Sequence, residues 1–381
     1  MGLGLGSDVD QPVRYHLSGF PPTNIDWPRL VPLIGRANAA LARYDGLIAS
    51  IPNSAVLLSP LTTQEAVLSS KIEGTVVTMG EVLKIEAGVD GDVSQPKRDD
   101  AEEIRNYRLA LRVASKAVEE RPLSQHLLRE LHALLMTGVR GRDKAPGAFR
   151  DAQNWIGAPG CPIDKASFVP IPQEQLSSGM DRWSDYVGDG RELDTLVELA
   201  IVHAEFEALH PFKDGNGRLG RMIIPLFLYQ RRILSSPNFY MSGYLEARRE
   251  QYIDALRGVS RDAAWTEWCA FFLEGVIEQA SENQAKAQAI IELNRRMAAE
   301  VAKATHSEHA NSAVEFLFNY PIFASTHFVK ESRIPRPTAL RFLRVFRDKG
   351  ILRTLREASG PTAAVYVFAE LLNIAEGKEI A

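Results

Sequence analysis

The fold of this chain is decided by the stretch His210-Pro211-Phe212-Lys213-Asp214-Gly215-Asn216-Gly217-Arg218-Leu219-Gly220-Arg221. It lies between two apolar segments with helical spacing, one running from Leu196 to Leu209 and one continuing through Met222. Gly215 and Gly217 permit a tight turn and a close approach of the backbone to a ligand. A helix that begins there directs free N–H groups at the same point. The stretch therefore predicts a helix, a phosphate-binding loop and a second helix.

The polar side chains of this stretch suit the chemistry of a nucleotide phosphate. Arg218 and Arg221 are three positions apart and share one helical face, where they can neutralise phosphate oxygens. Asp214 offers a hard oxygen ligand for Mg²⁺, and His210 is a side chain that accepts a proton near neutral pH. A His-Pro pair or a Gly-Asn-Gly turn alone is ordinary. Their combination with an acid and two arginines indicates catalysis, with His210 as the general base.

The stretch resembles the Fic (filamentation induced by cAMP) family signature HPFxxGNGRxxR at every position. The resemblance implies that a protein hydroxyl attacks the α-phosphorus of ATP while pyrophosphate leaves, so that AMP passes to the target. It assigns His210 as the base that deprotonates the hydroxyl, Phe212 as the anchor of the loop and Asp214 as the Mg²⁺ ligand.

The same resemblance assigns the phosphate contacts. It implies an anion hole for the α- and β-phosphates, formed by Gly215, Asn216 and Gly217. It also implies that Arg218 contacts the β-phosphate and that Arg221 contacts the γ-phosphate.

A second pattern, Ser69-Ser70-Lys71-Ile72-Glu73-Gly74, lies at the end of a helix expected from about Thr63 to Glu73. Ser69 and Glu73 are four positions apart on one face, and a glutamate in a last turn is unfavourable for the helix dipole. The pattern is similar to the Fic inhibitory motif [S/T]xxxE[G/N], which implies that Glu73 pairs with Arg221 and obstructs the γ-phosphate. A solvated glutamate before a C-cap at Gly74 is the alternative, and the motif at 210–221 favours inhibition.

Two strand-like runs, 154–157 and 168–171, flank the segment APGCPIDKAS and predict a β-hairpin. The hairpin resembles the flap over the active site of Fic proteins, where an exposed strand edge can pair with an extended target segment. Trp155 and Phe168 fit either target docking, which we favour, or packing beneath the hairpin. Tyr244 and Tyr252 lie where the family has an adenine-side helix, and they fit the protein core equally well.

Composition adds few restrictions. The 381 residues are 45% hydrophobic and 24% charged, and the formal net charge of −4 gives no overall bias toward nucleic acid or membranes. Cys161 and Cys269 match neither a metal-ligand spacing nor a disulfide framework, so we expect a cytoplasmic protein. Residues 1–12 lack the features of a signal peptide and are expected to form a disordered leader. The longest apolar stretch, 222–229, is too short to span a bilayer.

Helical spacing dominates the chain, so the expected fold is mainly α. We expect an N-terminal helical region with the inhibitory helix over 1–120, a Fic helical core with a short β-hairpin flap over 121–285, and a linker helix over 286–305. Residues 306–381 show the order helix, helix, helix, hairpin, which predicts a C-terminal winged helix. Its helices are expected at 313–318, 326–331 and 337–348, and its strands at 351–355 and 363–368.

The C-terminal domain concentrates basic residues. Between 333 and 356, eight arginines and lysines stand against Asp348 as the single acid. They are Arg333, Arg336, Arg341, Arg344, Arg347, Lys349, Arg353 and Arg356. The cluster fits contacts with phosphates, and it fits equally well the solvated side of a domain that docks a protein.

Together these patterns predict an autoinhibited protein adenylyltransferase that uses ATP and Mg²⁺ to modify a protein Ser, Thr or Tyr. Two alternatives stay open. One is removal of AMP, or transfer of another phosphate-containing group, by the same fold; the other is a DNA-binding regulator whose core only senses a nucleotide. The expected partners are a target protein at the flap, DNA or a protein at the winged helix, and a second copy in a homodimer, with no membrane.

Overall fold

The structure, a computed structural model, describes residues 11–51, 54–89, 91, 93–138, 141, 143–190 and 192–379. Helices predominate within these ranges and the strands are short, which confirms the mainly α fold. The chain forms two compact units. The first comprises residues up to 40, 110–237 and 244–278; the second comprises 41–109, 238–243 and the residues from 279 onward. The expected leader falls almost entirely outside the described residues, and the four-part domain division stays a prediction.

Three long helices have residues in both units: α1 (Trp27–Ala49), α5 (Gln95–Glu120) and α12 (Trp265–Thr305). The remaining elements of the first unit are β1 (Val13–Arg14), α6 (Gln125–Leu135), η2 (Ile163–Lys165), β2 (Phe168–Val169), η3 (Gln173–Gln175), α7 (Leu176–Asp189), α8 (Thr195–Leu209), α9 (Asn216–Gln230), most of α10 (Ser242–Ala247) and α11 (Arg249–Asp262).

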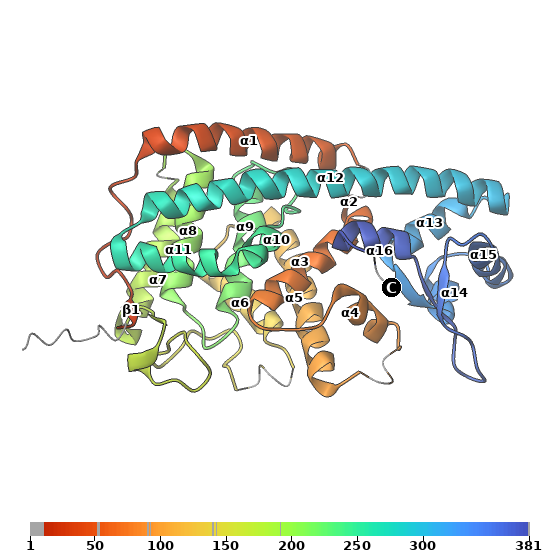
Figure 1. Ribbon diagram of the computed structural model, residues 1–381, viewed down its shortest axis with the longest axis horizontal. Coiled ribbons are helices and arrows are strands. Elements are labelled where there is room, and N and C mark those ends of the chain that lie inside the picture. The colour runs from red at the N-terminus through yellow and green to blue at the C-terminus, as the bar shows by residue number, and fades with distance from the viewer. Residues whose placement is uncertain are drawn as a thin grey trace, which may run out of the picture. The chain divides into compact units, whose positions relative to one another are not determined.

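Helices α8 and α9 form the centre of the first unit, and they lie side by side (Figure 1). Every residue of α8 from Leu196 to Leu209 is buried except Glu207. A helix buried on all its faces must be covered by neighbours on all sides. Gly220 lies where the two helices meet, since a Cβ there would contact the carboxylate of Glu207 and would lie 3.3 Å from Phe206 Cδ1, both on α8.

The second unit contains α2 (Ser54–Leu57), α3 (Ser59–Ile72), α4 (Met79–Glu86) and a C-terminal module. The module consists of α13 (Ala310–Asn319), β3 (Ile322–Ala324), α14 (Ser325–Glu331), α15 (Arg336–Asp348), β4 (Arg353–Arg356), β5 (Val365–Val367) and α16 (Ala369–Glu376). Its sheet is antiparallel with the order β3-β5-β4, so the expected three helices and hairpin are present. The sequence analysis missed β3 and α16, because a three-residue strand has no readable alternation and α16 follows directly on β5.

The predicted hairpin at 154–171 is reduced to one antiparallel bridge between Ile156 and Phe168. The strand β2 instead pairs in parallel with β1, and Val13 lies opposite Phe168. Phe168 and Val169 are both buried, so the alternation expected of a half-exposed hairpin strand is absent. The second neighbour of the strand comes from the N-terminal segment, and such a distant pairing leaves no local pattern in the sequence.

Within the described ranges, no helix combines the length and the apolar composition that a membrane crossing requires.

Candidate active site

The loop between α8 and α9 brings the predicted catalytic residues together. Asp194 starts α8, since its Oδ1 accepts hydrogen bonds from the backbone of Leu196 and Val197 at 2.9 and 3.2 Å. The helix ends at His210, whose left-handed backbone (φ 46°) redirects the chain. Gly215, with φ 76°, then starts α9 as its N-cap residue, and a glycine has no side chain with which to cap that end. The first turn of α9 therefore directs its N–H groups and its positive dipole end into the loop.

Glycine is required at position 215 for two reasons. A left-handed φ is unfavourable for residues with a Cβ. A Cβ at this position would also lie 2.9 Å from Met136 Sδ and 3.4 Å from Leu135 Cδ2, at the end of α6. The anion-binding turn predicted from the sequence is thus packed directly against α6.

Asn216 closes the loop with its side chain. Its Oδ1 accepts a hydrogen bond from Phe212 N, and its Nδ2 donates one to Phe212 O. Each bond is 2.9 Å long. Asn154 adds a 3.2 Å hydrogen bond to the same carbonyl. Because its carboxamide is engaged in this way and only 1% of the residue is exposed, Asn216 can contribute its backbone N–H, rather than its side chain, to an anion hole.

Phe212 is fully buried, as an anchor of the loop should be. Its ring stacks on His132 of α6, with centroids 3.9 Å apart and planes at 14°, and it also packs against Phe149. His132 accepts from Gly147 N at 2.9 Å through Nδ1, so the proton sits on Nε2, which donates to Asp214 O at 3.0 Å. Burial lowers the pKa of His132 to about 4, which keeps the ring neutral.

The two motif arginines lie in the first two turns of α9, where they are 4% and 2% exposed. Arg218 Nη2 lies 3.5 Å from Asp214 Oδ1 and 3.8 Å from Met136 Sδ. His203 on α8 lies beside Arg221, and its Nδ1 is 3.1 Å from the carbonyl oxygen of Gly220. Burial, with the charge of Arg221 as a smaller cause, lowers the pKa of His203 to about 3. The charge of Arg221 thus lies next to a neutral histidine.

Asp214 is the one motif side chain suited to a metal, and it is 48% exposed. Its Oδ1 accepts from Gly215 N at 2.5 Å. Among the described residues, no three His, Cys, Asp or Glu side chains gather as a metal-binding group. A single carboxylate beside a phosphate loop nevertheless fits Mg²⁺, which commonly takes one or two protein carboxylates and completes its shell with substrate phosphates and water.

Arg150 is a site residue that the sequence analysis missed. It is 3% exposed and donates to four carbonyl oxygens: Ala152 at 3.1 Å, Ile171 at 2.5 Å, Leu209 at 3.5 Å and His210 at 3.1 Å. Its own backbone N–H donates to Pro211 O at 2.8 Å. Arg150 therefore fixes both ends of residues 152–171, here called the flap segment, to the chain around His210.

The N-terminal segment Val13–His16, here called the strap, was also missed. Tyr15 N donates to Val169 O at 3.0 Å, and its hydroxyl donates to Glu205 Oε1 at 2.7 Å. His16 Nε2 contacts the other carboxylate oxygen at 2.9 Å, and its Nδ1 meets Ser260 Oγ at 2.8 Å. The strap therefore joins β2 to α8. A sequence signal did exist, because Glu205 is a charged residue within an apolar helix.

The two tyrosines left open by the sequence are both buried. Tyr244 and Tyr252 are 5% and 3% exposed. The Tyr252 hydroxyl lies 2.8 Å from His203 Nε2, to which it donates, because His203 Nδ1 carries the proton that faces the Gly220 carbonyl. Trp155 is 41% exposed, which fits target docking. Phe168 is buried, which fits packing beneath the hairpin.

The inhibitory pattern lies in the second unit. Helix α3 ends at Ile72, one residue before the expected end, and Glu73 follows as its exposed C-cap. Gly74 has φ 106°, as expected of a helix stop. Ser69 is fully buried, so its side chain packs inside the protein. The pairing of Glu73 with Arg221 stays a prediction.

Comparison with known proteins gives a consistent result. Residues 31–116 match the Fic/DOC family N-terminal domain and residues 122–228 match the Fic/DOC family, about half of the chain together. A probable protein adenylyltransferase of Aquifex aeolicus is 26% identical over 211 residues, 54% of this chain and 57% of that protein. The protein adenylyltransferase Fic of Drosophila willistoni is 26% identical over 163 residues, 41% of this chain and 30% of that protein.

Solved structures show the same fold. A Fic family protein from Desulfovibrio desulfuricans G20 has a TM-score of 0.58 at 20% identity, covering 91% of this chain and 98% of its own. A Fic domain-containing signalling protein from Bacteroides thetaiotaomicron has a TM-score of 0.53 at 18% identity, covering 66% and 97%. The chain thus spans little more than half of the first curated relative, and it resembles the Desulfovibrio structure over nearly its whole length.

Proposed function

Because the chain belongs to the Fic/DOC family, we propose that it is a protein adenylyltransferase that moves AMP from ATP to a Ser, Thr or Tyr hydroxyl of another protein. The observation that carries the proposal is the start of α9 at the left-handed Gly215, with Arg218 and Arg221 in the first two turns of the helix. This arrangement offers N–H groups and two permanent positive charges to a triphosphate.

His210 is the proposed general base. Its Nδ1 lies 3.4 Å from Glu207 O, an oxygen that can only accept, so Nδ1 carries the proton and Nε2 is the nitrogen that receives one. The Arg150 contact with His210 O holds the backbone of the base in place. As the hydroxyl oxygen bonds to the α-phosphorus, the bond from that phosphorus to the β-bridging oxygen breaks, and pyrophosphate leaves.

The remaining residues position the charges. The N–H groups of Asn216 and Gly217 and the guanidinium of Arg218 would hold the α- and β-phosphates, and Arg221 the γ-phosphate. Asp214 would hold Mg²⁺, which would neutralise part of the phosphate charge when bound. Since the loop is fixed by Asn216 and Phe212 before any ligand arrives, little reorganisation is needed at the moment of reaction.

We also propose that Glu73 inhibits the enzyme through Arg221. The support is the Ser69-to-Glu73 spacing, the position of Glu73 as an exposed carboxylate at a helix end, and a nearly buried Arg221. A carboxylate paired with Arg221 would compete with the γ-phosphate for the same charge. ATP would then bind in an unproductive position until Glu73 is displaced.

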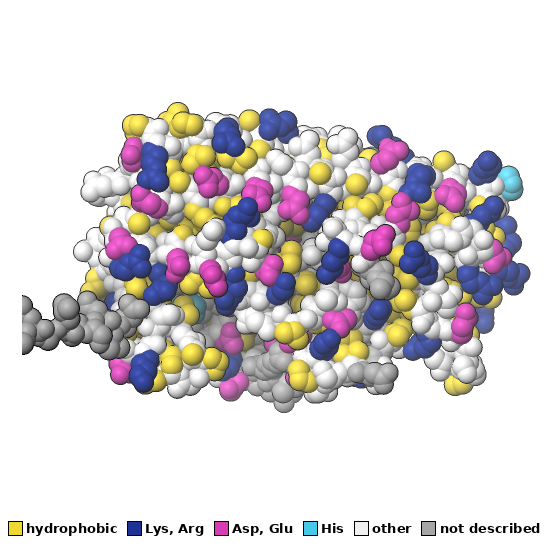
Figure 2. Space-filling view, viewed as in Figure 1, with side chains coloured by type: hydrophobic (Ala, Val, Ile, Leu, Met, Phe, Trp, Pro, Cys, Tyr) yellow, Lys and Arg dark blue, Asp and Glu magenta, His cyan; other side chains and the backbone are white. Residues whose placement is uncertain are grey.

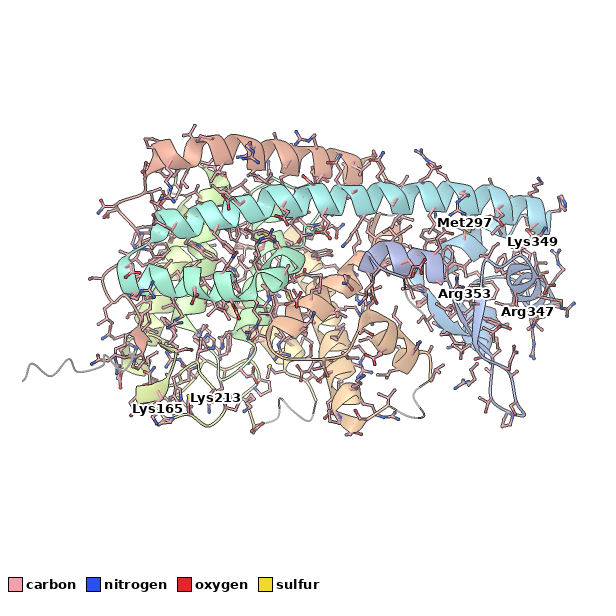
Figure 3. The ribbon with its side chains drawn as sticks, in the orientation of Figure 1. Lys165, Lys213, Met297, Arg347, Lys349 and Arg353 are labelled. Atoms are coloured by element: carbon pink, nitrogen blue, oxygen red, sulfur yellow. The ribbon has the colours of Figure 1, made fainter. Side chains whose placement is uncertain are left out.

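The exposed edge near Trp155 and Ile156, which are 41% and 39% exposed, is the proposed docking place of the target. An extended segment that pairs there gains backbone hydrogen bonds regardless of its sequence, while the aromatic surface adds apolar contact. Figure 3 labels Lys165 of the flap segment and Lys213 of the catalytic loop.

The supply of ATP makes the cytoplasm the proposed place of action.

The test uses α-labelled ATP, Mg²⁺ and a cell extract. Wild type, Glu73→Gly and Glu73→Gly/His210→Ala are compared with Glu120→Gly, which removes an exposed glutamate from the end of another helix. We expect labelled target bands with Glu73→Gly alone, and none with the double variant. Equal label in wild type, Glu120→Gly and Glu73→Gly would contradict inhibition. Label that follows γ-labelled instead of α-labelled ATP would contradict AMP transfer.

A further inference from the structure

Helix α15 presents a row of basic side chains that takes no part in AMP transfer. Arg336, Leu340, Arg344 and Arg347 are spaced by four, four and three residues, so they lie along one face, and all are exposed. Lys349 and Arg353 follow the end of the helix and are also exposed, but they line a cavity together with Arg296 and Glu370 and are not part of this row. Dark blue side chains gather over α15 in Figure 2, and Figure 3 labels Arg347, Lys349 and Arg353. We call Arg336, Leu340, Arg344 and Arg347 the basic face.

The orientation of α15 is fixed by the opposite side of the helix. Ala339, Phe342, Leu343 and Phe346 are buried. Phe346 packs on Phe342 with centroids 5.7 Å apart and on Phe328 of α14 at 6.4 Å. Because these rings anchor the helix in the module core, the basic face must point outward.

The structure divides the basic cluster found in the sequence. Arg341 donates to Thr305 O at 3.2 Å, and Arg356 donates to Gly88 O at 2.6 Å and to Ala363 O, so both have internal structural contacts. On the basic face, Arg347 has a weak pair with Asp348 at 3.6 Å. Among the described residues, no carboxylate pairs with Arg336, Arg344 or Arg353.

We propose that the basic face binds duplex DNA, with α15 lying in the major groove. The four residues 332–335 separate α14 from α15, and Arg333 turns the chain with φ 58°, which is the geometry of a helix-turn-helix. In that motif the second helix enters the groove with its N-terminal residues toward the bases, which here places Arg336 innermost.

The dimensions and the residue types fit this partner. The row from 336 to 347 is about 16 Å long, and a helix about 10–12 Å wide fits a major groove of about 12 Å. Arginine forks bind phosphate or the guanine edge, and an apolar side chain such as Leu340, 45% exposed, can contact a thymine methyl group. The chain as a whole is negatively charged, so this attraction must be local.

Other nucleic acids fit less well. Duplex RNA has a major groove too deep and narrow for a helix. Single strands are usually held by exposed aromatic rings, and both aromatic residues of α15, Phe342 and Phe346, are buried. An acidic protein has no requirement for a groove-sized row, and it is treated as a competing outcome of the test.

The test measures fluorescence anisotropy of a labelled mixed-sequence DNA duplex of about 24 base pairs with the full chain, over a salt series from about 50 to 200 mM. Arg344→Ala/Arg347→Ala is compared with Arg112→Ala/Lys116→Ala, which removes two exposed charges from α5. We expect log–log salt slopes to fall by about 0.9 for each lost phosphate contact, and Kd to rise roughly tenfold, in the first variant alone.

Three results would overturn the proposal: no binding at the lowest salt, equal weakening in both variants, or better competition by duplex RNA or polyglutamate than by duplex DNA. His210→Ala should bind DNA as the wild type does. DNA binding therefore stands or falls independently of AMP transfer.

Discussion

Arg150 donates from Nε to the carbonyl oxygen of His210 over 3.1 Å, and the same guanidinium reaches Ile171 O just beyond β2. One buried side chain thus couples the proposed catalytic base to the flap segment. Burial lowers the pKa of Arg150 to about 10, so the guanidinium stays charged at neutral pH. Hydrogen bonds from a charged donor to carbonyl oxygens in a buried place are among the stronger ones in a protein.

The first prediction concerns Arg150→Lys. An ammonium keeps the charge but cannot donate to four carbonyls in different directions. We expect the free energy of unfolding to fall by about 2–3 kcal/mol and amide exchange in residues 152–171 to accelerate. Urea denaturation and hydrogen exchange measure these changes, with Arg36→Lys on the exposed side of α1 as the control. Unchanged exchange in the flap segment would show that Arg150 does not hold it.

The second prediction concerns His132→Phe. The new ring preserves the stack on Phe212 but leaves Gly147 N–H and Asp214 O without their partner. We expect unfolding to become easier by about 1–3 kcal/mol, and the KM for MgATP to rise because the backbone of Asp214 is no longer held. His126→Phe, at a 74% exposed side chain of the same helix, is the matched control. An unchanged KM for MgATP in His132→Phe would show that His132 does not contribute to the site.

The third prediction is a pH dependence set by His203. Its pKa is about 3 in the folded protein and about 6.5 when unfolded, so below pH ~6.5 the unfolded state binds more protons. Stability therefore falls as the pH drops toward ~3 and is unaffected by this group below that value. Between about pH 7 and pH 5 the loss amounts to about 2 kcal/mol.

His203→Gln should lack this loss while retaining a side chain that can hydrogen bond. The measurement is the free energy of unfolding of the variant and the wild type at both pH values, with His126→Gln as the exposed control. Parallel pH profiles for wild type and His203→Gln would contradict the assignment.

The sequence predicted what is contiguous. The loop from His210 to Arg221 is one unbroken stretch, so its glycines, base and arginines could be recognised together. His132 and Arg150 could not, because they act on residues 82 and 60 positions away and bind backbone carbonyls, which any residue provides. Glu205 stands out as a charged residue in an apolar helix, but its partner Tyr15 lies 190 positions away, so the sequence does not indicate what it binds. The parallel β1–β2 pair was missed because two-residue strands carry no periodicity.

The last prediction tests whether the strap and α8 act as one unit. Tyr15→Phe and Glu205→Gln each remove part of a buried hydrogen bond, and each should lower the free energy of unfolding by about 1–3 kcal/mol. Since the two side chains contact each other directly, the double variant should lose less than the sum, with a coupling of about 1–2 kcal/mol. The cycle of four proteins is measured by urea denaturation.

The control cycle combines Tyr15→Phe with Glu120→Gln, at an exposed position on α5 where no coupling is expected. Hydrogen exchange gives a second readout, because Tyr15 N–H donates to Val169 O in the flap strand and should exchange faster once Glu205 no longer holds the tyrosine. Coupling below about 0.5 kcal/mol together with unchanged Tyr15 exchange would mean that β1 stays on β2 by its backbone pairing alone. The buried carboxylate of Glu205 would then stabilise α8 rather than the flap segment.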